Sequence, residues 1–339
     1  MIRRHRVVAT YDARLAVAVC EQRTLGYSQP ASTVDRPAHV RAASGLTRAL
    51  GRWYVVQDDT AFVGVVDDAT VDAIELPLPI EAGVRRQFSA AIGNKAAKPD
   101  FEACFTAGAG GQDGQVDALR VWAFGSGSTA RRRDIAQLDP LTGATCRFDA
   151  TSLHLQIVDE LGHLPNIEGA CVYLDELWLF HRGNTGGRDL GCCAFAWPWR
   201  AVVAWLLNGG PVPAMTAVTA FDLGDIKGVR WGITDVALGP AGRVAVLCAA
   251  ESSANAVDDG AVIGARIGVL DVDAAGVWTQ LRTVDLPTAV TGAGNYKPEG
   301  LFIDETSPGH AFLVADPDDT EVPAVLCEVA LAGPWWPVS

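Results

Sequence analysis

A pattern of short apolar runs recurs five times along the chain, and this repeat limits the possible folds more than any other feature. Its clearest copy, residues 165–184, reads as a strand, a turn, a second strand and a polar tip (PNIEGACVYLDELWLFHRGN). Aligning the copies places these residues in one column: Ser44, Glu102, Glu168, Thr234 and Glu299. Successive members are 58, 66, 66 and 65 residues apart. A steady period built from β-runs is typical of repeat folds such as β-propellers.

Each repeat offers a first, a second and often a third strand. The second strands are expected at residues 53–56, 119–124, 177–180, 244–248 and 311–314, and third strands at, for example, 267–271 and 324–329. The last repeat ends soon after its third strand, whereas residues 7–19 hold a spare strand. Pairing the two would remove open sheet edges, which favour aggregation. We therefore expect one all-β domain over residues 1–339, a five-bladed propeller closed by the N-terminal strand pairing with the C-terminal repeat. Six blades is the alternative if residues 1–43 hold more strands.

The charge and the apolar segments exclude several classes of protein. Lys and Arg total 27 against 40 Asp and Glu, a net charge of −13, so a nucleic-acid partner is not expected. The eight cysteines include no C-x-x-C pair, which argues against a zinc site or a disulfide framework. Residues 194–207 are too short to span a membrane, and their tryptophans suggest buried packing, a short helix or an exposed patch. We expect a cytoplasmic protein with no membrane partner.

Acidic residues recur where the first strands begin. In a propeller these strands line the central channel, so Glu102, Glu168, Asp235 and Glu299 should converge near one mouth. Facing carboxylates repel one another and must share protons, pair with bases or hold a cation. Oxygen ligands without a His or Cys cluster favour Ca²⁺ over zinc. The alternative is that each acid caps its own turn or bonds a neighbouring backbone N–H.

Basic residues gather at the polar tips on the same face. Residues 131–133, Arg188 and Arg266 each precede a third strand, and His181 and Arg182 follow a second one. Arginine suits phosphate or carboxylate ligands, and a histidine at such a place is able to act as a general base. The candidate catalytic residues are therefore His181, Arg131, Arg182 and Arg266. The alternatives are charge balance for the arginines and an ordinary surface position for His181.

Three short motifs at the strand starts carry a family resemblance. Ser-Gly-Leu at residues 44–46, Glu-Gly at 168–169 and Glu-Gly-Leu at 299–301 resemble the SdiA-regulated five-bladed propellers and the neighbouring phytase-like and esterase-like propellers. The resemblance covers nearly the whole chain and implies calcium near the axis. The resemblance implies metal-ligand positions at Glu102, Glu168 and Glu299, and Asp235 lies one position outside the aligned column. Ser44 and Thr234 depart from an all-acidic ring.

Two functions are compatible with this pattern. The first is a calcium-dependent hydrolase of phosphoesters or other anionic esters, in which the cation polarises an oxygen and activates water while arginines hold the anion in the central funnel. The second is a non-catalytic module that binds a small ligand or a peptide and keeps a structural metal. The sequence leaves the substrate and the oligomeric state open.

Overall fold

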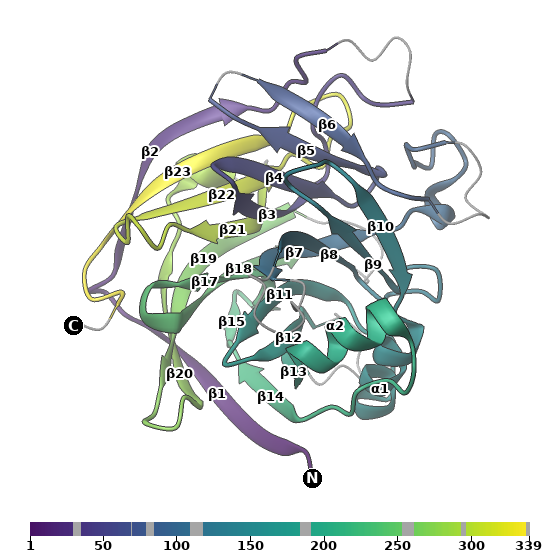
Figure 1. The fold of residues 1–339 in the computed structure, drawn as a ribbon. Helices are drawn as coiled ribbons and strands as arrows, with labels where there is room; N and C mark the ends of the chain where they lie inside the picture. The colour runs from purple at the N-terminus through teal and green to yellow at the C-terminus, as the bar shows by residue number, and fades with distance from the viewer. Residues whose placement is uncertain are drawn as a thin grey trace.

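A computed structural model of the protein describes residues 1–29, 35–68, 70–78, 85–108, 118–183, 191–252, 261–292 and 296–336. Within these ranges the chain is mostly β (Figure 1), and its main strands form five sets of four. The first set is β3 (Ala43–Ala49), β4 (Arg52–Gln57), β5 (Phe62–Val66) and β6 (Val71–Glu75). The second is β7 (Phe101–Gly108), β8 (Leu119–Gly125), β9 (Asp134–Leu138) and β10 (Thr145–Asp149). The third is β11 (Ile167–Tyr173), β12 (Glu176–His181), β13 (Cys193–Pro198) and β14 (Ala217–Asp222).

The remaining two sets complete the circle. The fourth is β17 (Gly232–Gly239), β18 (Arg243–Ser252), β19 (Ala261–Val272) and β20 (Trp278–Asp285). The fifth is β21 (Lys297–Ile303), β22 (His310–Asp316), β23 (Val325–Ala332) and β2 (Ala16–Thr24). The first strands of the sets contact one another in the closed order β3, β7, β11, β17, β21 and back to β3. Sets of antiparallel strands around a common axis make a β-propeller-like fold.

The first strands β3, β11, β17 and β21 are mostly buried, and β7 is buried over half of its residues, because neighbouring sets pack against both of their faces. In β11, for example, six of the seven residues are buried. Each first strand contains an irregularity in its pairing with the second strand, and the residue skipped is the one aligned in the sequence: Ser44, Glu102, Glu168, Thr234 and Glu299. A β-bulge leaves one residue unpaired and redirects its side chain. The repeat column is therefore a column of bulges.

The N-terminal strands have two different partners. β2 pairs antiparallel with β23, as expected for closure by the C-terminal repeat. β1 (Arg3–Tyr11) lies parallel to both β14 and β20. It thereby joins the third and fourth sets into one nine-stranded sheet (Figure 1), a contact that the sequence did not predict. Arg3 also forms an ion pair with Glu176, with 2.6 Å between nitrogen and oxygen. A single N-terminal segment thus connects three of the five sets.

The remaining elements are three helices, two 3-10 turns and a short hairpin within the described ranges. They are α1 (Thr151–Leu161), α2 (Trp199–Asn208), α3 (Thr288–Thr291), the 3-10 turns η2 (Lys95–Ala97) and η3 (Pro240–Gly242), and the hairpin β15 (Asp225–Ile226) and β16 (Val229–Arg230). The tryptophan-rich segment forms β13 and α2, and Trp197 and Trp199 are buried in the core, so the packing interpretation is confirmed. Cys20, Cys104, Cys146, Cys171, Cys248 and Cys327 are free thiols. In the described ranges, no helix is both long and apolar enough to cross a membrane.

Candidate functional site

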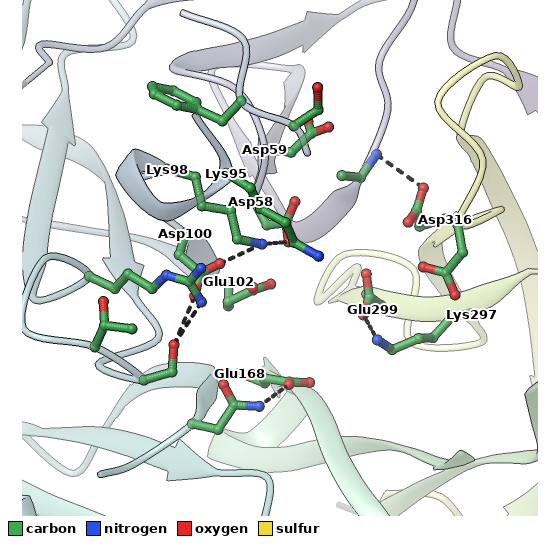
Figure 2. Close-up of a pocket in the computed structure, with 18 of the residues that line it drawn as sticks. Asp58, Asp59, Lys95, Lys98, Asp100, Glu102, Glu168, Lys297, Glu299 and Asp316 are labelled. Atoms are coloured by element: carbon green, nitrogen blue, oxygen red, sulfur yellow. Dashed lines mark hydrogen bonds and ion pairs between the residues drawn. The ribbon is translucent and has the colours of Figure 1, made fainter. Parts of the chain in front are cut away.

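A cavity of about 720 Å³ opens where the first strands begin. Its described lining includes nine acidic and six basic residues. The acids are Asp58, Asp59, Asp100, Glu102, Glu168, Glu299, Asp316, Asp318 and Asp319, and the bases are Arg41, Lys95, Lys98, Arg132, Arg182 and Lys297. Figure 2 shows Glu102, Glu168 and Glu299 around the same open space. Three of the four acids expected at the channel mouth therefore line one cavity.

Asp235 is the fourth expected acid, and it lies outside this lining. Its fully buried carboxylate accepts hydrogen bonds from the backbone N–H groups of Val236 and Leu301, both at 2.7 Å. Burial raises the pKa of Asp235 well above its usual range. The Asp235 side chain thus joins β17 to β21. It bonds neighbouring backbone N–H groups, as the alternative interpretation of these acids expected, and it does not line the cavity.

The bulge hydroxyls have the same structural role. Ser44 Oγ donates to the carbonyl oxygen of Phe101 at 2.6 Å, and Thr234 Oγ1 donates to that of Pro298 at 2.9 Å. Each bond connects one first strand to the residue before the bulge of the next strand. Ser44 and Thr234 therefore depart from the acidic column because they hold neighbouring sets together.

One side of the cavity is organised around Lys98. Its ammonium group contacts Asp58 and lies 2.6 Å from Asp100 Oδ1. Asp100 also accepts hydrogen bonds from Ser126 and, at 3.0 Å, from Arg132. Burial works to lower the pKa of Lys98, but the carboxylates around it outweigh burial and raise that pKa. The Lys98 ammonium therefore stays charged between two carboxylates.

The opposite side is organised around Arg182 and Lys297. Arg182 pairs with Glu168 at 3.1 Å and with Glu251 at 2.5 Å. Lys297 Nζ lies 2.6 Å from Glu299 and 3.4 Å from Glu251. Burial works to lower the pKa of Lys297, yet the nearby carboxylates raise it well above its usual value. Both sides of the cavity thus repeat one arrangement, a buried cation shared by two acids.

Glu102 lies beside Asp58 and Asp100, on the Lys98 side of the cavity, and differs from the other lining acids. In the part of the chain that the structure describes, its carboxyl has no hydrogen bond and no ion pair with protein. Burial, with the charges of Asp58 and Asp100, raises the pKa of Glu102 well above its usual value, against the opposing effect of Lys98. These effects favour the neutral form of the Glu102 carboxyl.

Other carboxyls of the cavity are also shifted toward the neutral form. Burial raises the pKa of Glu299 to about 8, although Lys297 opposes the shift. Burial and Asp58 raise the pKa of Asp59 to about 7. Burial and the charge of Glu299 raise the pKa of Asp316 well above its usual value, and Asp316 accepts a hydrogen bond from the backbone N–H of Ala42 at 3.0 Å. Shifted carboxyls that share a cleft are typical of functional sites.

The four candidate catalytic residues do not lie together in the structure. Arg182 lines the cavity, whereas Arg131 is exposed and the next residue, Arg132, points its guanidinium toward Asp100 instead. Arg266 is not among the lining residues and pairs with Asp285 at 2.7 Å, over the ring of Trp231.

His181, the fourth candidate, ends β12 and is fully buried; it is not an exposed tip residue. Its Nδ1 accepts a hydrogen bond from the backbone N–H of Asn166 at 2.9 Å. His181 therefore supports the segment that leads into β11. Arg188 lies outside the described residues.

The family of the chain follows from a match over most of its length. Residues 39–331 match the model of a family of unknown function, DUF6929. The chain belongs to the DUF6929 family. No curated protein sequence matches the DUF6929 chain. The resemblance to SdiA-regulated and phytase-like propellers stays a prediction.

Several solved structures are similar in fold to this DUF6929 chain. The glutaminyl cyclase of Myxococcus xanthus has a TM-score of 0.45 at 12% identity, with coverage of 97% of this chain and 98% of that one. The aldose sugar dehydrogenase of Streptomyces coelicolor, in its PQQ-bound form, has a TM-score of 0.44 at 12% identity, covering 95% and 100%. MPT-4, a mannose phosphorylase from Leishmania mexicana in complex with a phosphate ion, has a TM-score of 0.44 at 11% identity, covering 92% and 88%. These likenesses concern the fold alone.

Sequence reasoning missed the two lysines that organise the DUF6929 cavity. A signal for them exists, because Lys-Pro precedes two of the bulges: Lys98-Pro99 stands before Glu102, and Lys297-Pro298 stands directly before Glu299. A residue before proline is restricted to extended conformations, which suits the approach to a strand. The recurrence of a base at the start of two acidic strands was the available indication that the acids are paired.

The fit of a cation to the DUF6929 cavity depends on Lys98. Oxygen atoms of Asp58, Asp100 and Glu102 all lie within 4.8 Å of one another, and hard cations such as Ca²⁺ take oxygen ligands. The Lys98 ammonium, however, already contacts two of these three acids. A divalent cation would therefore take the place that this ammonium holds.

Proposed function

We propose that the DUF6929 chain is a small-molecule-binding protein whose ligand enters the cavity on the axis of a single five-bladed propeller domain. Concave sites with a few convergent polar groups are the usual places for small ligands, and the cavity has an appropriate size. The polar groups come from the starts of several first strands and from the loops beside them, so the ring of sets determines their spacing.

The observation that carries the proposal is the lone carboxyl of Glu102. Every other described acid of the lining has a partner: for example, Lys98 for Asp58, Arg41 for Asp59 at 2.9 Å and the Glu321 N–H for Asp319 at 2.9 Å. Glu102 is half-buried and lines the cavity, so its carboxyl is accessible to a group that a ligand supplies. Retaining such a group in a cavity is accounted for if a ligand supplies the missing partner.

The test is a thermal-shift screen with four kinds of probe: neutral sugars, alkylamines, inorganic phosphate and calcium chloride. We expect at least one probe to raise the melting temperature, because a ligand that binds only the native state stabilises it. Glu102→Gln should remove most of that shift, since it keeps the shape but removes the ionisable group. Glu305→Gln is the matched control, because Glu305 is exposed in the β21–β22 turn. A shift that is equal in the wild type and in Glu102→Gln would refute the assignment of this cavity.

Calcium-dependent hydrolysis of an anionic ester is the second candidate. It is favoured by the mutual proximity of the Asp58, Asp100 and Glu102 oxygens, which would hold the cation. Bound calcium would polarise a substrate oxygen and activate water. Arginines are the residues expected to hold the anion, and Arg132 and Arg182 both line the cavity.

Calcium binding has its own test. After chelator treatment, calcium at a hundredfold excess over its dissociation constant should stabilise the native state by about 2.7 kcal/mol. Metal analysis of the protein must accompany the melt, since a tightly retained ion would hide the effect. The absence of both a shift and a retained ion would exclude this candidate.

A further inference from the structure

The cavity already binds two ammonium groups of the chain itself. Lys98 Nζ contacts Asp58 and lies 2.6 Å from Asp100, and Lys297 Nζ lies 2.6 Å from Glu299 and 3.4 Å from Glu251. Both lysines are more than nine-tenths buried. The interior of this site is therefore built to hold alkylammonium groups between carboxylates.

The basic side chains of the lining leave little opportunity for an anion. Arg132 pairs with Asp100, Arg182 with Glu168, and Arg41 with Asp59, in addition to the two lysines. Lys95 is the remaining base, and it is exposed on η2. An anionic ligand would have to displace a carboxylate of the protein from one of these cations, whereas a cationic ligand would not.

The acids, in contrast, exceed the bases. Nine described acids line the cavity against six bases, and the whole chain carries a net charge of −13. Glu102 is the lining acid that forms no ion pair and no hydrogen bond within the described chain, although the charge of the nearby Lys98 ammonium acts on it.

From this arrangement we propose that the ligand of the cavity carries an ammonium group that pairs with Glu102, repeating what Lys98 and Lys297 do with their own acids. The inference rests on the proposed binding function and specifies its ligand class as an amine-bearing small molecule. A divalent metal is a poorer occupant, since the one group of three close acids already contains the Lys98 ammonium.

Three pairs of probes matched in shape test the inference by calorimetric titration of the full chain near pH 7. They are glucosamine and glucose, butane diamine and butane diol, and an amino alcohol and the corresponding diol, with inorganic phosphate as the anionic probe. We expect at least one amine to bind at least tenfold more tightly than its neutral counterpart. Glu102→Gln should weaken that amine at least tenfold, and Glu305→Gln should leave it unchanged.

The outcomes separate this inference from the binding function itself. A neutral probe or phosphate that binds as tightly as the amines, and is weakened by Glu102→Gln, would overturn the ammonium inference while supporting the cavity. Amine binding that Glu102→Gln does not change would overturn both. If no amine binds at millimolar concentration, the ammonium inference fails, and the thermal-shift screen decides the binding function separately. Circular-dichroism melts of Glu102→Gln establish that the variant is folded.

Discussion

Single carboxyls of the cavity are maintained in the neutral form by burial, and this makes the free protein sensitive to pH. Glu299 is the clearest case, because its pKa rises to about 8 from the usual 4.5 despite the neighbouring Lys297. A carboxyl with a higher pKa in the folded state binds its proton more tightly there. Its contribution to stability is therefore complete below pH 4.5 and is lost as the pH rises toward 8.

The raised pKa of Glu299 gives a prediction for the pH dependence of stability in Glu299→Gln. The stability of the wild type should decline between about pH 5 and pH 8, and the variant should show a flatter profile, because the amide cannot titrate. Urea unfolding at a series of pH values measures the change. Profiles of equal slope for the two proteins would show that Glu299 does not titrate in this window.

Glu102 allows a second prediction for the free protein. Replacing its partnerless carboxyl by the neutral amide in Glu102→Gln should raise stability at pH 8 by about 1 kcal/mol, since the cost of ionising a buried acid disappears. The difference should shrink as the pH falls toward 5, because the raised pKa of Glu102 favours its protonated form there. Loss of stability in the variant at both pH values would indicate that Glu102 has a structural partner.

At the level of elements, the glycines after the bulges determine how closely the first strands approach. A Cβ atom on Gly300 would lie 2.4 Å from Val314 Cγ2 and 2.8 Å from the backbone nitrogen of Leu46. A Cβ atom on Gly45 would lie 2.8 Å from Val56 Cγ2. The contact at Gly300 would force β21, which carries Glu299, away from the backbone of β3.

We therefore expect Gly300→Ala to destabilise the fold by about 1–3 kcal/mol, the usual effect of overpacking a core. Gly309→Ala is the matched control, because a Cβ there would meet only the Leu331 carbonyl oxygen, at 3.9 Å. Chemical denaturation of both variants gives the comparison. Equal effects of the two substitutions would contradict the close approach of β21 to β3.

The strands and their column of bulges could be predicted from the repeat, whereas the pairing within the cavity could not. Periodicity located Glu102, Glu168 and Glu299 because a fixed repeat places equivalent residues at equivalent depths. The partners of these acids come from other loops, so the Lys98 and Lys297 pairings appear only in the folded chain. Asp235 lies outside the cavity lining because its position, one residue along the strand, directs its carboxylate toward the backbone N–H of Leu301.

At the level of the whole molecule, the N-terminal segment closes the fold twice. β2 completes the fifth set beside β23, and β1 covers the outer edges of β14 and β20. The sequence indicated the first contact because the last repeat lacked a strand. It did not indicate the second, because a parallel strand shared by two sets leaves no mark in the repeat.

Two truncations should differ in severity. Removing residues 1–11 exposes the edges of β14 and β20 but keeps the ring closed, so we expect a folded protein with a lower melting temperature. Removing residues 1–24 also deprives the fifth set of β2, and we expect aggregation. Size-exclusion chromatography and thermal melts distinguish the two. A soluble, cooperatively melting chain without residues 1–24 would contradict the role of β2 in closure.

The central claim is that the Glu102 carboxyl pairs with an ammonium group of the ligand. Titrating that carboxyl tests the claim most directly. Isotope-edited NMR of glutamate-labelled protein, assigned by comparison with Glu102→Gln, follows its ionisation with and without the tightest-binding amine probe. The groups that face Glu102 are Asp58, Lys98, Asp100 and Glu168, and their net charge opposes its ionisation. We predict a pKa well above the usual glutamate value in the free protein and a fall toward that value when the amine binds. A Glu102 carboxyl that titrates normally in the free protein, or whose titration the bound amine does not change, would contradict the account.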